Sequence, residues 1–159
     1  KKDELNKLYE EYSFLLFTGL LGEADKRYFR RGSENMDDSD ASLSLYQLSD
    51  YLYRYYGKKV IILLDEYDTP MQEAYVNGYW EELVAFTRSL FNSTFKTNPY
   101  LERAIMTGIT RVSKESIFSD LNNLKVITVT NEEYSKCFGF TEKEVFDALD
   151  EQGISGEKE

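Results

Sequence analysis

The sequence predicts an α/β fold in which parallel strands are flanked by helices. Short, continuous apolar runs rich in β-branched residues are typical of strands that are buried on both faces of a sheet. Helical patterns lie between these runs, and strand-helix-strand alternation favours right-handed crossovers within one sheet. We expect strands at about residues 59–65, 101–107 and 125–129.

Residues 1–42 are expected to form a helical segment and a polar loop of the same domain. Apolar residues recur at helical spacing from residue 3 to residue 21. The stretch from 32 to 42 is rich in Asp, Ser and Asn, which favours a loop. Asp40 or Ser42 should then cap a helix that ends at Gly57.

Residues 43–153 should hold the strands and the remaining helices, followed by a tail at 154–159. After the first strand, Thr69-Pro70 supplies a helix cap and a proline in the first turn. A longer helix is expected from about Tyr79 to Phe95, because its apolar residues keep helical spacing.

Two capped helices should close the chain. Thr130 with Glu133, and Thr141 with Glu144, both match the pattern of a capping box. Gly153 then serves as the stop of the last helix.

Composition excludes several classes of function. The net charge is −10, and the one basic cluster lies among acidic residues, so we expect no direct nucleic-acid binding. No apolar run approaches the roughly 18 residues of a membrane span. The absence of histidine excludes Ser-His, Cys-His and His-metal chemistry. The single Cys137 excludes an intrachain disulfide and fits the reducing cytoplasm, where we expect the protein.

The most informative string is VIILLDEYD, at residues 60–68. An apolar strand that ends in Asp-Glu is the pattern of a Walker B element. Asp65 at the strand end can hold Mg²⁺, and Glu66 can polarise the water that attacks a γ-phosphate. The alternative is a buried strand that simply exits into solvent, where acidic residues are common. Asp68 is more typical of an N-cap or loop carboxylate.

The second strand ends in residues that fit the same chemistry. Thr107 places a hydroxyl at the strand tip, where a sensor of the γ-phosphate would sit. Arg111 follows a few residues later and could face developing phosphate charge. The alternatives are a threonine that completes the strand and an arginine paired with a surface acid.

A phosphate-binding loop is missing from the sequence. Such a loop needs the pattern G-x-x-x-x-G-K-S/T after a strand and before a helix. The only Gly-Lys, at Gly57-Lys58, precedes a strand and lacks the upstream glycine. We therefore expect this chain to bind neither Mg²⁺ nor ATP alone, and to be inactive by itself.

Three runs resemble the bacterial AAA-ATPase-like family over about residues 42–149: GKKVIILLDEYDTPMQEAY, FTRSLFNSTFKTNPYLERAIMTGITRVSKESIFSDLNNL and FGFTEKEV. Its members often carry a C-terminal nuclease-like domain. The resemblance implies a partial P-loop NTPase core of the ASCE type, with the Walker A strand and loop N-terminal to this chain. It also implies Asp65 and Glu66 at the Walker B positions and Thr107 near the sensor position. Mg²⁺ and ATP then belong to the intact parent protein.

The resemblance has a structural consequence for the sheet. In related P-loop ATPases, the Walker A strand lies centrally, between the sensor strand and the last strand. Without it, strand 59–65 should lie beside strand 101–107, with a gap before 125–129. We expect the last strand to pair elsewhere, or the exposed strand edges to be covered by self-association.

Two other functions remain open. The first is a scaffold or regulatory interaction module with an ATPase-like fold, which the 13 tyrosines and 10 phenylalanines would suit. The tyrosine-rich helix at about 45–56 could instead pack on the sheet. The second is a metal site built from Asp65, Glu66 and Asp68 for hydrolysis without nucleotide.

Overall fold

The computed structural model describes residues 2–34, 36–109, 117–118, 121, 123–128, 130–137 and 139–154. The chain divides into two units, Lys1–Leu124 and Lys125–Glu159. The first unit is mostly helical and contains a two-stranded parallel sheet, so the predicted α/β class is confirmed. The expected domain boundaries after residues 42 and 153 stay a prediction.

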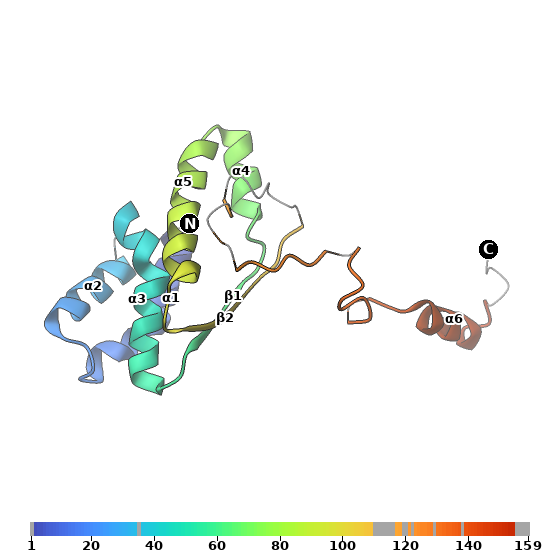
Figure 1. Ribbon diagram of the computed structural model, residues 1–159, viewed down its shortest axis with the longest axis horizontal. Coiled ribbons are helices and arrows are strands. Elements are labelled where there is room, and N and C mark those ends of the chain that lie inside the picture. The colour runs from blue at the N-terminus through green and yellow to red at the C-terminus, as the bar shows by residue number, and fades with distance from the viewer. Residues whose placement is uncertain are drawn as a thin grey trace. The chain divides into compact units, whose positions relative to one another are not determined.

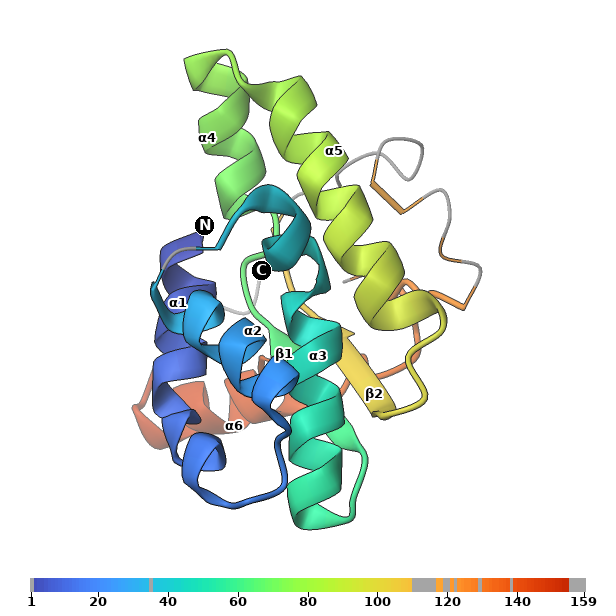
Figure 2. The same cartoon turned by 90° about the vertical axis from the view of Figure 1, so that its left-hand side faces the viewer.

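The first unit begins with a cluster of helices. These are α1 (Lys2–Glu11), the 3-10 helix η1 (Ser13–Phe17), α2 (Glu23–Glu34) and α3 (Asp38–Tyr56). Their apolar faces enclose a first core that contains Leu5, Tyr9, Leu15, Phe29, Leu48 and Tyr51. Within this unit α3 contacts α1 and α2 as well as α5 (Trp80–Phe91) and β1 (Val60–Leu64) (Figures 1 and 2).

The loop expected at residues 32–42 is wrong, because α2 runs through Gly32 and α3 already begins at Asp38. Gly32 is a contact residue and not a helix breaker. A Cβ at this position would lie 2.4 Å from the ring of Tyr9, which packs against α2. The cap of α3 is Asp37, whose side chain accepts a hydrogen bond from the Asp40 N–H at 2.7 Å. Gly57 ends the helix in the left-handed conformation, as predicted.

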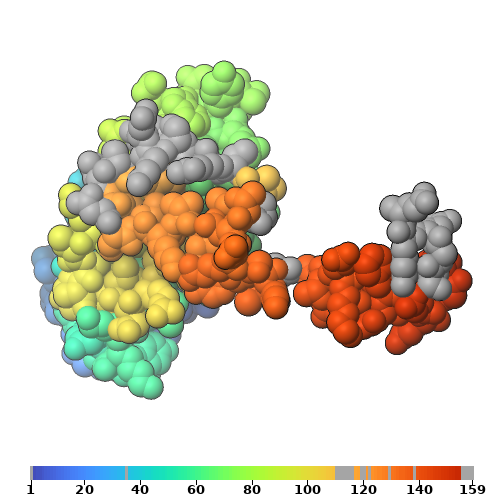
Figure 3. All heavy atoms as spheres, turned by 45° about the vertical axis from the view of Figure 1, so that its right-hand side comes forward, coloured from blue at the N-terminus to red at the C-terminus, as the bar shows by residue number. Residues whose placement is uncertain are grey.

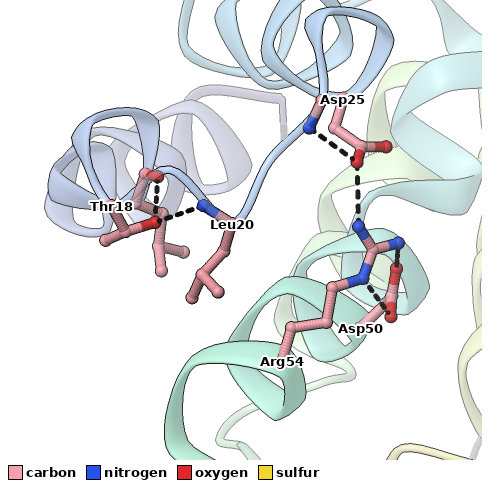
Figure 4. A network of polar contacts seen from close by, with 7 residues as sticks. Thr18, Leu20, Asp25, Asp50 and Arg54 are labelled. Atoms are coloured by element: carbon pink, nitrogen blue, oxygen red, sulfur yellow. Dashed lines mark hydrogen bonds and ion pairs between the residues drawn. The ribbon is translucent and has the colours of Figure 1, made fainter.

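An ion-pair network joins α2 to α3 (Figure 4). The Arg54 guanidinium donates from Nε to Asp50 at 3.0 Å and from Nη1 to Asp25 at 2.8 Å. Its Nη2 also bonds to Asp50, so the pair on α3 is bidentate. Hydrogen bonds to Asp50 raise the pKa of Arg54.

The remainder of the first unit forms the sheet and the helices that cover it. The chain continues through β1 (Val60–Leu64), α4 (Thr69–Asn77), α5 (Trp80–Phe91), one π-helical turn η2 (Asn92–Lys96) and β2 (Leu101–Met106). The two strands are parallel, with Leu64 opposite Met106 (Figure 1). The predicted strands at 59–65 and 101–107 are thus confirmed, as are the helix after Thr69-Pro70 and the helix from about Tyr79.

The segment that leads into β2 lies against the end of α3. Tyr100 packs on Tyr46 and Tyr53, with ring centroids 5.8 and 5.5 Å apart. In the space-filling view, the yellow atoms of η2 and the start of β2 border the blue-green atoms of the end of α3 (Figure 3). This contact links the helical cluster to the sheet.

Only one face of the sheet is covered by the described residues. Ile62, Leu64 and Ala104 pack into a second core with side chains of α4 and α5. On the opposite face Ile61, Leu63 and Ile105 are 60%, 72% and 50% exposed. The expectation of strands buried on both faces is therefore wrong for the part of the chain that the structure describes, because its covering helices all pack on the same side.

The strand expected at 125–129 is also wrong over residues 125–128, which are irregular; Val129 lies outside the described residues. A strand exists only where a neighbouring strand pairs with its backbone. Here the Thr128 N–H donates to the side chain of Asn131 at 2.7 Å, and the Asn131 N–H donates back to Thr128 O. These groups close a turn and are not part of a sheet ladder.

The second unit contains α6 (Glu142–Glu151). Its capping box is formed as predicted, with Thr141 and Glu144 bonding to each other's backbone N–H, and Gly153 follows with a positive φ. The helix expected after Thr130 is wrong, because residues 130–137 form turns and irregular backbone instead of a helix. The Glu133 carboxylate binds Lys125 at 2.6 Å, so it does not close a box with Thr130. Within the described residues no helix is both long and apolar enough to cross a membrane.

Candidate functional site

The candidate site lies where β1 and β2 end. Because the strands are parallel, both carboxyl ends meet at the same edge of the sheet. Backbone pairing continues beyond the strands: the Thr107 N–H donates to Leu64 O at 2.9 Å, and the Tyr67 N–H donates to Thr107 O at 3.0 Å. The loop after β1 is thereby held against the first residues after β2.

Asp65 and Thr107 are brought into direct contact at this edge. The Thr107 hydroxyl donates a hydrogen bond to Asp65 Oδ1. The Glu66 N–H donates to the same oxygen at 3.0 Å. Both side chains are exposed, so the Asp65 carboxylate is oriented by two donors and still faces solvent. The predicted positions of these two residues at neighbouring strand ends agree with this geometry.

Glu66 adopts a backbone conformation that is unusual for its residue type. Its φ is +51°, in the left-handed region that favours glycine. Its carbonyl accepts a hydrogen bond from the Thr69 N–H at 3.1 Å, which closes the turn into α4. A non-glycine residue in this region costs about 1–3 kcal/mol, and such strain gathers at functional sites. The exposed Glu66 side chain is thus set beside Asp65 by a strained turn.

Asp68 lies apart from the exposed acids. It is 1% exposed and precedes α4 as its N-cap residue, yet its side chain makes no capping bond. Its Oδ2 accepts instead from the Ile109 N–H, after β2, at 3.1 Å. Asp65, Glu66 and Asp68 do not form a metal cluster, and the described residues contain no group of three His, Cys, Asp or Glu suited to a metal ion.

Sequence reasoning missed Tyr67 and Gly108, which pack between the two loops. A Cβ on Gly108 would lie 2.7 Å from Asp68 Oδ1 and 2.7 Å from the Tyr67 ring. That ring contacts Phe118 edge-on, with centroids 5.4 Å apart. Gly108 could have been identified from its position directly after an apolar strand, because a glycine there often marks a place where another segment approaches the backbone closely.

Arg111, the remaining predicted site residue, lies outside the described residues, together with the segment 110–116. Its role in charge stabilisation therefore stays a prediction. The described neighbours on either side are Ile109, at the candidate site, and Ile117, which is buried in the second core.

Comparison with known proteins gives two matches. A family model described as "Predicted AAA-ATPase" matches residues 5–118. A protein of Azotobacter chroococcum mcd 1, named "Uncharacterized protein in vnfD 5'region", is 33% identical over 90 residues. These residues make up 56% of this chain and 17% of that relative, so the chain spans only a small part of its length. No solved structure matches the chain.

Proposed function

The chain belongs to the predicted AAA-ATPase family, and on this premise we propose that Asp65, Glu66 and Thr107 form the Walker B and sensor part of an ATP-hydrolysing site. The observation that carries the proposal is the contact between Thr107 and Asp65 at neighbouring ends of two parallel strands. In open α/β sheets, ligands bind at this edge. The proposal includes a P-loop NTPase core that the two strands would share with further strands.

The oxygen atoms at this edge suit a magnesium ion bound to ATP. Magnesium in nucleotide sites is held by one or two carboxylates together with phosphate oxygens and water. Asp65 offers one exposed carboxylate, with the Thr107 hydroxyl beside it. Asp65 would hold the ion, which when bound would neutralise charge on the β- and γ-phosphates.

The chain's own residues then have separate tasks. Thr107 orients the Asp65 carboxylate and offers a hydroxyl near the γ-phosphate. Glu66, exposed and one residue further on, polarises the attacking water. Arg111 is assigned the stabilisation of developing phosphate charge, on the strength of its position in the sequence alone.

No G-x-x-x-x-G-K-S/T pattern occurs among these 159 residues. The matched part of the chain covers 17% of its Azotobacter relative. We therefore propose that ATP binding and hydrolysis belong to the complete protein and that this chain alone does neither. A cytoplasmic location, where ATP is abundant, goes with this proposal.

The test compares Mg·ATP binding by calorimetry in this chain and in the complete gene product, with ATP turnover measured alongside. We expect binding and turnover only in the complete protein. Glu66→Gln in that protein should abolish turnover and keep ATP binding, whereas the matched Glu102→Gln, at an exposed position within β2, should change neither. If the complete protein does not bind ATP, the proposed ATPase function is refuted.

One observation favours a second candidate function, that of a protein-interaction module without catalytic activity. Aromatic rings gather at the surface where η1 meets the end of α3: Phe14 contacts Tyr55 at 5.2 Å, and Phe17 is 87% exposed. Exposed rings of this kind are enriched at protein interfaces. Biological activity that survives Glu66→Gln but is lost in Phe17→Ser would support this module over the ATPase.

A further inference from the structure

We propose that Asp68 is a positioning residue, which holds the backbone after β2 so that Thr107 meets Asp65. This inference deepens the proposed function and rests on it for its catalytic consequence. The contact itself belongs to this chain and can be tested without ATP. Asp68 takes no part in the chemistry assigned above.

Asp68 ties together two segments that are 41 residues apart in sequence. Its carbonyl accepts hydrogen bonds from Met71 and Gln72 at 3.0 and 3.1 Å, which fixes it at the start of α4. Its carboxylate oxygen Oδ2 accepts from the Ile109 N–H at 3.1 Å and also from the Gln72 side chain at 3.5 Å. With 1% of its surface exposed, this carboxylate makes its hydrogen bond away from competing water.

The backbone at Ile109 is held by this bond and not by packing of its own side chain, which is 92% exposed. Between Ile109 and Thr107 lies only Gly108, whose missing Cβ lets the backbone approach Asp68 and Tyr67. The bonds of Thr107 to Leu64 O and to the Tyr67 N–H, together with the bond from the Ile109 N–H to Asp68, fix the backbone from residue 107 to residue 109. Since the Thr107 hydroxyl orients Asp65, the carboxylate of Asp68 indirectly sets the direction of the Asp65 carboxylate.

The first experiment is a nuclear magnetic resonance study of this chain. It measures amide hydrogen exchange at Ile109 and the χ1 angle of Thr107, for which the bond to Asp65 should favour one rotamer. Asp68→Ala should speed exchange at Ile109 by about tenfold or more and average the Thr107 rotamer. Asp68→Asn keeps an oxygen acceptor. Its amide exchange at Ile109 and its Thr107 rotamer should therefore be closer to those of the unaltered chain than in Asp68→Ala.

Two further variants separate positioning from general loss of stability. Ile109→Pro removes the N–H donor at an exposed side-chain position, and it also fixes φ there; it should average the Thr107 rotamer as Asp68→Ala does. Asp37→Ala removes the carboxylate that caps α3 and should leave Thr107 unchanged. A single Thr107 rotamer in both Asp68→Ala and Ile109→Pro would overturn the proposal.

The second experiment measures ATP turnover in the complete protein. Asp68→Ala should lower kcat about tenfold or more with little change in KM, as is common for residues that orient a metal ligand. The double variant Asp68→Ala/Thr107→Val should be no slower than the slower single variant, because both act through one contact. Multiplied losses would overturn the positioning role. If the unaltered complete protein shows no turnover, the proposed function fails, and the Thr107 rotamer still decides the role of Asp68.

Discussion

At the scale of single residues, the candidate site combines exposed polar groups with a tightly packed support. Asp65 and Thr107 face solvent, whereas Asp68 is buried. Gly108 is the residue that permits this arrangement, because its Cα approaches both Asp68 and Tyr67. A side chain at Gly108 would press on the two groups that hold the loops together.

We predict that Gly108→Ala lowers the free energy of unfolding by about 1–3 kcal/mol, the usual cost of overpacking a close contact. The new Cβ would meet atoms at 2.7 Å, which have to move. Urea denaturation measures the effect. The control is Gly22→Ala, where no atom lies within 4 Å of a Cβ, and a change within about 0.5 kcal/mol is expected. Equal changes in the two variants would contradict the prediction.

At the scale of secondary-structure elements, the helices are held by charged contacts of unequal strength. Arg54 joins α3 to α2 through Asp50 and Asp25, and Asp50 is buried. Other ion pairs, such as Lys7 with Glu4 on α1, lie in solvent. Surface pairs contribute little, whereas removing one partner of a buried pair leaves a charge without compensation.

Arg54→Met should therefore lower the free energy of unfolding by about 2 kcal/mol, less than for a fully buried pair because the guanidinium is partly exposed. Thermal and urea denaturation measure the loss. Lys7→Met, which breaks an exposed pair of the same charge type, should change stability by about 0.5 kcal/mol or less. Asp50→Asn combined with Arg54→Met should recover part of the loss, because no buried charge then lacks a partner.

Helix α6 should respond to pH through its capping box. Hydrogen bonds from Thr141 lower the pKa of Glu144 below its ordinary value of 4.5. A lowered pKa in the folded state means that the contribution to stability is complete above pH 4.5 and is lost as pH falls through the folded pKa. Backbone chemical shifts of residues 142–146 should report this loss of helix. In Glu144→Gln, which keeps a capping side chain without its titration, the shifts of Val145 and Phe146 should vary less with pH.

At the scale of the whole molecule, the first unit has two cores and one uncovered sheet face. Phe86 of α5 packs against both cores, so helical cluster and sheet are joined through that helix. Helices α4 and α5 cover one side of β1 and β2, and Leu63 is 72% exposed on the other. Apolar faces and unpaired strand edges of this kind favour association with other surfaces.

We predict that this chain associates with itself through the sheet. Its mass in light scattering should rise with concentration, and Leu63→Lys should keep it monomeric, because a charge on the uncovered face opposes contact. Phe17→Ser, on the exposed aromatic surface of η1, should leave association unchanged. Loss of association in Phe17→Ser alone would assign the contact to the aromatic surface and contradict the prediction.

Local signals in the sequence were sufficient to locate many of the secondary-structure elements. The apolar runs located both strands, Thr69-Pro70 located the start of α4, and Thr141 with Glu144 located the cap of α6. Gly57 likewise marked the end of α3. Each of these signals acts within about four residues, through backbone dihedrals and side chains that bond to the nearest N–H groups. The strand ends also placed Asp65 beside Thr107, because parallel strands that pair end at one edge.

Tertiary contacts decided what no local pattern could. Gly32 stays without a side chain because the ring of Tyr9 fills that space, and residues 125–128 form no strand with any other described segment. The buried Asp68 has its role only because Ile109, far along the chain, delivers an N–H to it. The sequence by itself therefore determined both strands, the ends of several helices, the family and the acids at the strand end. The packing of distant segments determined which of these elements pair and which carboxylate supports the site, since both depend on partners that a local pattern does not contain.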